Sequence, residues 1–200
     1  MSTLFPTLIH AQSHADALSL KELEATIWML AEEDTAGQDW CEREGYDGYT
    51  SYASLDDLPE RAPIFAELVA LLDKQAAAFA RQLHWDLTGG KLVLDSLWVN
   101  VLGEGGSHSG HIHPNSVISG TIYVAMPKGA GAIKFEDPRL PMMMNAPPLL
   151  QVAPEDRSRF VYKTPEPGTA LMWESWLRHE VMQNRSEEPR LSVSFNYNFE

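Results

Sequence analysis

The sequence contains little that would tie it to an oxidising compartment or to a membrane. It has one cysteine, Cys41, so no internal disulfide can form, and this fits a reducing compartment. No run approaches the roughly 18 apolar residues that a membrane span needs. The first residues also lack a basic segment followed by an apolar core, so we expect no signal peptide. Together these absences predict a soluble, cytoplasmic protein.

Positive charge is also scarce in this chain. Its 200 residues include 15 Lys and Arg against 28 Asp and Glu, which gives a formal net charge of −13. Binding to phosphate backbones needs a basic footprint, so this balance argues against a nucleic-acid partner. With no apolar span, we expect no membrane partner either. A surplus of acid suits a cationic substrate, but a diffuse acidic surface accounts for it more simply.

The first part of the chain, about residues 1–88, is expected to form a mainly helical layer. Ser19 and Glu22 have the S-x-x-E spacing of a capping box, in which each side chain satisfies a free backbone donor at a helix start. A second helix is expected from about Pro63 to about Leu83, because proline suits a first turn and apolar residues follow at helical spacing.

Between these two helices we expect mostly loop. The apolar stripe of the first helix continues to Leu30, and Gly37 lies just past the expected helix end. Residues 41–59 are rich in Gly, Asp, Ser and Tyr, which is typical of an irregular connection.

From about residue 89 to residue 200 the pattern changes to short strands. Residues 91–102 are β-branched and aromatic and apolar on nearly both faces, which predicts a buried strand. Further strands are expected at "SGTIYVAM", "GAIKFED", "RFVYK", "TALMW" and "RLSVSFNYNF", separated by Pro/Gly turns and by a long loop over 138–154. Short strands punctuated by turns favour a sandwich or barrel. We therefore predict a single domain, residues 1–200, in which the helical layer packs on an all-β unit.

Three of the seven histidines stand within six residues, in "GGSHSGHIHPNS". If the chain is extended there, His111 and His113 point to the same side and can reach one metal ion. A third ligand must come from elsewhere, and outside this cluster the β half has one more histidine, His179. Neutral imidazole suits Fe, Zn, Cu or Ni, so the ligand type does not choose the metal. An exposed turn and a core histidine are the competing interpretations.

The last expected strand alternates apolar and polar side chains. A period of two places its apolar residues on one face and Arg190, Ser192, Ser194 and Asn196 on the other. A half-exposed strand is the simpler interpretation, but such a strand usually carries Lys, Glu and Thr. Arg190 offers a planar donor fork that matches a carboxylate, and Ser192 can add a hydroxyl donor to the same group.

In combination, H-x-H, "SGTIYV", "PGTALMWESWLRHEV" and "RLSVSFN" resemble the Fe(II)- and 2-oxoglutarate-dependent oxygenases. The most similar group is the uncharacterised bacterial and phage 2OG-Fe(II) oxygenases, which carry "HxHPNSxxSGxxYV" and "SWLxHEV…RxSxSFN". The resemblance covers roughly Tyr49 to Asn198. It implies an α+β fold, a double-stranded β-helix (jelly roll, cupin-like) with the N-terminal helices packed on one sheet.

The resemblance also implies a metal site. His111 and His179 match the two histidine ligands of the iron. The chain departs from the pattern at the third ligand, because His113 stands where the superfamily usually has Asp or Glu. We expect His113 to bind the metal in place of that carboxylate. One alternative is that His108 is the third ligand and His113 does not bind the metal directly. Another is that the site is not catalytic.

Fe(II) as cofactor and 2-oxoglutarate as co-substrate follow from the same resemblance. Arg190 and Ser192 match the R-x-S pair that holds the far carboxylate of 2-oxoglutarate. Tyr123 is either a further contact to that carboxylate or a core tyrosine. The implied reaction hydroxylates a substrate and releases succinate and carbon dioxide.

The substrate itself is a small molecule or a peptide that the sequence does not identify. Trp98, Asn100, Trp173 and Trp176 are expected around the cavity, most of them as core residues. Glu174 is expected near its mouth, where it meets a cationic substrate or is simply solvated. The 138–154 loop is expected to shape the choice of substrate. The oligomeric state is open, and a homodimer is compatible with the sequence.

Two other classes of protein compete with the oxygenase. A cupin-type metal protein, working without 2-oxoglutarate, is suggested by Gly105 followed after five residues by H-x-H. The cupin motif then requires a Glu near Ile118, which is missing, and it does not explain Arg190 and Ser192. A non-enzymatic interaction protein, with the histidines in an exposed loop, predicts no stoichiometric metal and no 2-oxoglutarate binding.

Overall fold

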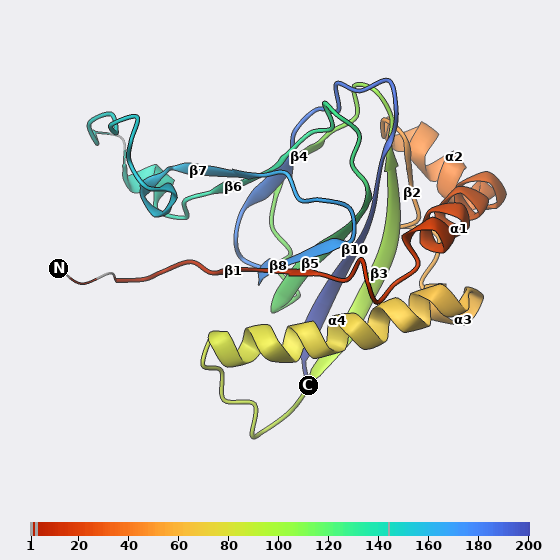
Figure 1. Ribbon diagram of the computed structural model, residues 1–200, viewed down its shortest axis with the longest axis horizontal. Coiled ribbons are helices and arrows are strands. Elements are labelled where there is room, and N and C mark those ends of the chain that lie inside the picture. Colours follow the sequence, from red (N-terminus) through yellow and green to blue (C-terminus); the bar gives the residue numbers. More distant parts are fainter. Residues whose placement is uncertain (1, 3, 144) are drawn as a thin grey trace.

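The computed structural model describes residues 2, 4–143 and 145–200. Within these residues, helices from the first half of the chain lie against one of two antiparallel β-sheets (Figure 1). This arrangement confirms the expected α+β class. The helices are α1 (Leu20–Glu33), α2 (Thr35–Glu44), α3 (Leu58–Arg61) and α4 (Pro63–Gln82). None of the described helices is long and apolar enough to cross a membrane.

The helix starts follow the sequence signals closely. At the start of α1 the Ser19 hydroxyl accepts a hydrogen bond from the backbone N–H of Glu22, at 3.3 Å, as the S-x-x-E pattern predicts. Helix α4 spans the residues expected for the second helix.

The stretch between those helices is more ordered than the sequence predicts. Gly37 does not follow a helix end but lies inside α2, because the carboxylate of Asp34 caps that helix by accepting from the Gly37 N–H at 3.0 Å. The 41–59 segment, expected to be loop, contains the end of α2, the short strand β2 (Tyr49–Thr50) and the start of α3. The expectation of loop there was therefore wrong in part.

Six strands form the first sheet, called sheet A. The sequence did not predict one of its two edge strands, β1 (Ile9–Ser13), because that short segment is half exposed and has no marked alternation of apolar and polar residues. In spatial order the sheet contains β1, β8 (Thr169–Glu174), β5 (Ile118–Ala125), β10 (Arg190–Phe199), β3 (Leu92–Leu102) and β2.

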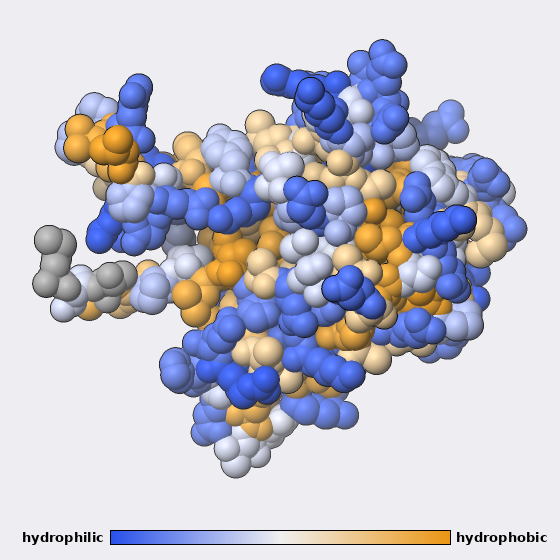
Figure 2. Space-filling model, viewed as in Figure 1, coloured by the Kyte–Doolittle hydropathy of each residue, from blue (hydrophilic) through white to orange (hydrophobic). Residues whose placement is uncertain are grey.

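Four strands form the second sheet, called sheet B. In spatial order they are β4 (His108–His111), β9 (His179–Val181), β6 (Ile133–Glu136) and β7 (Phe160–Lys163). The connection between β6 and β7 projects from the body of the molecule (Figure 1) and contains two short 3-10 helices, Leu140–Met142 and Glu155–Arg157. Apolar side chains are exposed on this projection (Figure 2), among them Met142 and Leu150.

Strand β10 shows how the core and the site share one sheet. Its apolar face packs under the helices, with Phe195 and Tyr197 fully buried in the main core. Its polar face is buried as well, because it turns toward sheet B: Arg190 and Ser192 are each only 2% exposed. The half-exposed interpretation of this strand was therefore wrong. The alternation itself is confirmed, except that the last apolar residue, Phe199, is 44% exposed.

A second, smaller cluster of apolar residues joins the two sheets. It contains Leu171 and Trp173 from β8 and Ile133 and Phe135 from β6. This apolar contact packs the inner face of sheet A against sheet B. The polar residues of the candidate site lie in the same space between the two sheets.

Candidate metal centre and carboxylate pocket

Three histidines converge between the sheets. Strands β4 and β9 pair so that His111 lies directly opposite His179, and His113 follows two residues after His111. The imidazole centroids of His111 and His179 are 4.4 Å apart, and that of His113 lies 5.1 and 5.3 Å from the other two. One ring nitrogen of each lies within 4.8 Å of the others. The pairing of β4 with β9 thus brings together histidines that are far apart in the sequence.

Hydrogen bonds fix which nitrogen each ring presents. The Nδ1 atom of His111 lies 2.7 Å from the carbonyl oxygen of Ser109, and that of His179 lies 2.9 Å from the carbonyl oxygen of Leu177. A carbonyl oxygen can only accept, so Nδ1 carries the proton in both rings. Each Nε2 therefore presents a lone pair, which is the arrangement that metal-binding histidines usually have.

The protonation states also suit a metal. Burial, and then the charge of a neighbouring His111, lower the pKa of His113 to about 4 and the pKa of His179 to about 3. Both rings are neutral at pH 7, as metal binding requires. Two nitrogens bound at about 2.1 Å to one ion are at most about 4.2 Å apart. The ring nitrogens, which lie within 4.8 Å of one another, are close to this spacing.

His108 takes a different position from the other three. Its Nε2 atom lies 2.5 Å from the hydroxyl of Tyr46, and the two rings are 5.3 Å apart. Burial, followed by the charge of Arg190, lowers the pKa of His108 to about 4. The converging nitrogens come from His111, His113 and His179, and His108 is not among them.

Arg190 is a buried cation without an ion-pair partner in the described residues. Its Nε atom is buried with no hydrogen bond, and so is the hydroxyl of Tyr123, whose ring centroid is 5.1 Å from the guanidinium carbon. A buried, unpaired charge is costly. The arrangement therefore fits an anion that enters from outside the chain, and a carboxylate matches the planar donor fork.

Hydroxyl and amide groups line the sheet A face beside Arg190. Ser192 pairs with Asn100 of β3, and the Asn100 amide donates to the Ser194 hydroxyl at 3.1 Å. Ser194 in turn lies 2.6 Å from the hydroxyl of Thr121. These bonds link the Asn100, Ser194 and Thr121 side chains across three neighbouring strands.

These groups enclose a narrow space, which we call the inner cavity. Its volume is about 40 Å³, enough for only a few water molecules, so its side chains must move apart to admit a five-carbon dicarboxylate. Trp98 and Trp173, two of the aromatic residues expected around the cavity, line it. The inner cavity is lined by Trp98, Asn100, His108, His111, His113, Gly120, Thr121, Ile133, Trp173, His179, Val181, Arg190, Ser192 and Ser194.

Gly120 has a structural reason to be glycine in the "SGTIYV" stretch. A Cβ atom at this position would lie 2.3 Å from the Phe195 ring and 2.5 Å from the carbonyl oxygen of Leu171. The absence of a side chain makes room for the Phe195 ring on the apolar face of sheet A.

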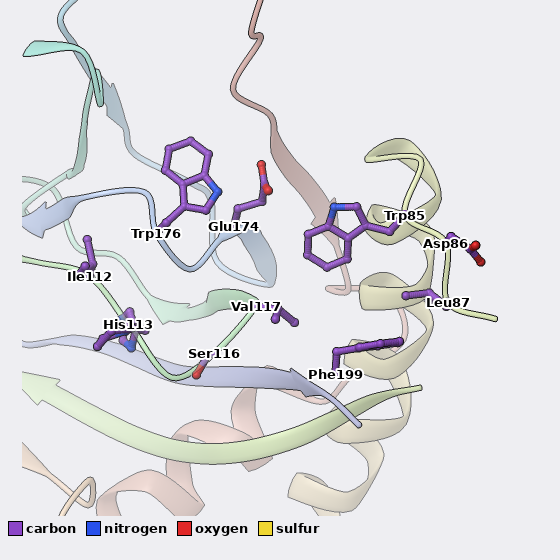
Figure 3. A pocket seen from close by; sticks show the side chains of 11 residues that line it. Trp85, Asp86, Leu87, Ile112, His113, Ser116, Val117, Glu174, Trp176 and Phe199 are labelled. Atoms are coloured by element: carbon purple, nitrogen blue, oxygen red, sulfur yellow. The ribbon is translucent and has the colours of Figure 1, made fainter. Parts of the chain in front are cut away.

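A second, larger space lies on the other side of His113, and we call it the outer pocket (Figure 3). Its volume is about 450 Å³. Glu174 and Trp176, expected near the cavity, line this pocket and not the inner cavity. The outer pocket is lined by Trp85, Asp86, Leu87, Ile112, His113, Pro114, Ser116, Val117, Glu174, Trp176 and Phe199.

The described residues of the long loop over 138–154 line neither space. Two of them, Pro138 and Arg139, border a third hollow beside Ser2 and Leu4–Ile9. The expectation that this loop shapes the choice of substrate therefore gains no support from its position.

Some residues of the site gave no signal in the sequence. Tyr46 lies in a stretch expected to be loop, and it reaches His108 only because Gly45 ends α2 in a left-handed conformation, with φ of 65°. Thr121 is an ordinary polar residue of a buried strand. A contact across 62 positions, as between Tyr46 and His108, leaves no local pattern to detect.

Comparison with known proteins places the chain in a family. Residues 96–196, half of the chain, match the family model described as "Putative 2OG-Fe(II) oxygenase". The chain therefore belongs to this family of oxidoreductases, and Fe(II) and 2-oxoglutarate are its cofactor and co-substrate. A comparison with curated proteins finds no match.

Solved structures share the fold at low sequence identity. The epimerase SnoN from nogalamycin biosynthesis, in complex with Fe3+, alpha ketoglutarate and nogalamycin RO, is 15% identical, with a TM-score of 0.66 over 96% of this chain and 79% of that one. EctD from S. alaskensis with 2-oxoglutarate and 5-hydroxyectoine is 16% identical, with a TM-score of 0.63 over 96% and 72%. At such identities the likeness concerns the fold.

The chain spans 56% of the length of an oxidoreductase of the 2OG-Fe(II) oxygenase family from Burkholderia pseudomallei. That match covers 66% of this chain at 17% identity and a TM-score of 0.47.

Proposed function

We propose that this protein hydroxylates a C–H bond of its substrate in an Fe(II)- and 2-oxoglutarate-dependent reaction. The proposal includes a double-stranded β-helix built from sheets A and B, within a single domain of residues 1–200. It is supported by the facing antiparallel sheets and by the pairing of the first strand, β1, with β8 near the other end of the chain.

The iron ligands in this proposal are His111, His113 and His179. The fixed tautomers of His111 and His179 support Nε2 as the ligand atom of each. His113 replaces the carboxylate that is usual in the superfamily, and an all-imidazole set leaves the ion more positive than a 2-His-1-carboxylate set does. Three protein ligands leave positions free for 2-oxoglutarate and dioxygen.

The observation that carries the proposal is the unpaired Arg190, which lies on the same cavity as the three histidines. In this role the guanidinium binds the far carboxylate of 2-oxoglutarate, and the Ser192 hydroxyl adds a second donor. The buried hydroxyl of Tyr123, which has no partner among the described residues, is a third donor beside Arg190. A cupin-type metal protein has no need of this buried cation.

When iron and 2-oxoglutarate are bound, dioxygen supplies one oxygen atom to the substrate C–H bond and one to succinate, as the 2-oxo acid loses carbon dioxide. The chain positions the reacting groups and excludes water from them. The three imidazoles hold the reacting centre, with His111 and His179 on the paired strands β4 and β9 and His113 on the segment that follows β4. Trp98 and Trp173 line the inner cavity and exclude bulk water.

The Arg190 role is tested by anaerobic calorimetry of 2-oxoglutarate binding to the Fe(II)-loaded protein. We expect Arg190→Ala to weaken binding by about 2–5 kcal/mol, the usual cost of removing one partner of a buried, hydrogen-bonded charge pair. Arg185→Ala, at an exposed arginine, is the matched control and should bind normally. Unchanged affinity in Arg190→Ala would falsify the carboxylate role. Iron binding without 2-oxoglutarate binding in the wild type would favour the cupin-type alternative.

A further inference from the structure

The outer pocket adjoins the proposed metal ligands and has the size of a small-molecule site. At about 450 Å³ it lies within the range of about 300–1,000 Å³ that such sites occupy. His113 lines both this pocket and the inner cavity. A molecule bound in the outer pocket therefore sits beside the metal centre, on the side away from Arg190.

The walls of this pocket are aromatic. Trp85 comes from the segment after α4, Trp176 from the turn after β8, and Phe199 from the end of β10. In Figure 3 the indoles of Trp85 and Trp176 stand on opposite sides of the pocket. Trp176 is 45% exposed and Phe199 44%. Large aromatic faces that remain open to water around one hollow are typical of a binding site.

The charged groups of the pocket are acidic. Its lining includes Glu174 and Asp86 and contains no Lys or Arg. The Oδ1 atom of Asp86 accepts hydrogen bonds from both the backbone N–H and the hydroxyl of Thr88, so this carboxylate is partly engaged within its own turn. Within the described part of the chain, the Glu174 carboxylate has no ion pair, and it lies between the two indoles in Figure 3.

Resting on the proposed function, we propose that the outer pocket recognises a substrate by an alkylammonium group, held between Trp85 and Trp176 and neutralised by Glu174. Aromatic faces attract ammonium groups, and more strongly when water is excluded. The net charge of −13 adds a long-range attraction for cations.

Other ligand classes fit this pocket less well. An anionic group would meet Glu174 without any basic residue in the lining to offset it. A neutral apolar group would pack on the indoles but would strip water from the carboxylate without replacing it, which is unfavourable. An alkylammonium group satisfies both the rings and the carboxylate. It can belong to a small molecule or to a lysine side chain of a peptide.

The test compares a charged probe with its uncharged isostere. Choline and 3,3-dimethylbutan-1-ol have the same shape and differ in the charge, and binding of each to the Fe(II)- and 2-oxoglutarate-loaded protein is followed anaerobically by tryptophan fluorescence and calorimetry. We expect choline to bind at least about tenfold more tightly than the alcohol. Glu174→Gln should reduce that preference to roughly threefold or less, while Glu187→Gln, at an exposed glutamate, should preserve it.

Further arms identify the source of the ammonium group. An N-acetyl-lysine amide and a short peptide with one lysine are titrated in the same way. Equal affinity for the two indicates a small-molecule substrate, and a clear gain for the peptide indicates a peptide substrate; either supports an ammonium site.

Two results would overturn the proposal. In one, choline and the alcohol bind equally. In the other, no cationic probe binds at millimolar concentration although 2-oxoglutarate binds. The proposed function fails separately, because its failure is the loss of 2-oxoglutarate binding by the wild-type protein.

Discussion

The inner cavity and the outer pocket meet at His113 but are built in opposite ways. The inner cavity is narrow and is lined by histidines and hydroxyl groups together with apolar side chains, and it contains one buried cation, Arg190, without a partner in the described residues. The outer pocket is about ten times larger, and it is aromatic and acidic, with Glu174 between two indoles. In our proposals, the first space receives an anion and the second receives a cation.

This contrast suggests that the proposed binding of the co-substrate and the proposed choice of substrate are assigned to two different kinds of backbone. Most groups of the inner cavity stand on paired strands, whose ladder hydrogen bonds hold them in register, and His113 follows two residues after β4. The groups of the outer pocket come from connections and from strand ends, where residues change with little cost to the fold. A co-substrate that never changes suits the first kind of site, and a substrate that differs between relatives suits the second.

The largest effect is expected from removing a metal ligand of the inner cavity. Substitution of a residue that hydrogen-bonds to a metal ligand usually lowers metal affinity about 10–100-fold. Removal of a ligand itself, in His179→Ala or His111→Ala, should lower the affinity at least as much and abolish stoichiometric iron. Iron content after anaerobic loading and desalting measures this. His84→Asn is the control, because His84 is exposed and has a positive φ of 55°, which asparagine tolerates.

The same measurement decides which histidine completes the set. His113→Asp restores the usual carboxylate and should retain iron, whereas His113→Ala should lose it. His108→Ala should retain iron, because His108 bonds to Tyr46 and lies outside the converging group. Full iron in His113→Ala, with loss in His108→Ala, would reverse this assignment.

A smaller effect is expected in the pH dependence of stability of the metal-free protein. Burial lowers the pKa of His108 to about 4, well below its value of about 6.5 in the unfolded chain. Between these values the unfolded state binds one more proton, so this contribution is complete above about pH 6.5 and is lost as the pH falls toward 4. In urea denaturation between pH 6.5 and 5, His108→Gln should reduce the slope by about 1 kcal/mol per pH unit. An unchanged slope would show that His108 is protonated freely in the folded protein.

The inner cavity was largely readable from the sequence because its residues lie in short local patterns. H-x-H spacing placed His111 and His113 together, and the period of two in β10 placed Arg190 and Ser192 on one face. These patterns persist because strand geometry is repetitive. The half-exposed interpretation of β10 was wrong, because its polar face is buried. The role of this face toward a carboxylate stays a prediction.

The rest of the site could not be read in this way. The outer pocket joins Trp85, Glu174, Trp176 and Phe199, which come from three separate parts of the chain and share no spacing. Strand β1 was missed because an edge strand with one exposed face needs little hydrophobic pattern. In each case the information lies in the packing of distant segments, and the sequence shows only single residues.

The central claim is that three imidazoles hold one iron beside an arginine that binds 2-oxoglutarate. Its most direct test is a crystal grown without oxygen in the presence of Fe(II) and 2-oxoglutarate, measured at the iron absorption edge. The account predicts one anomalous peak about 2.1 Å from Nε2 of His111, Nε2 of His179 and a ring nitrogen of His113, with a carboxylate of 2-oxoglutarate on Arg190. A peak elsewhere, or a 2-oxoglutarate molecule that leaves Arg190 unpaired, would contradict it.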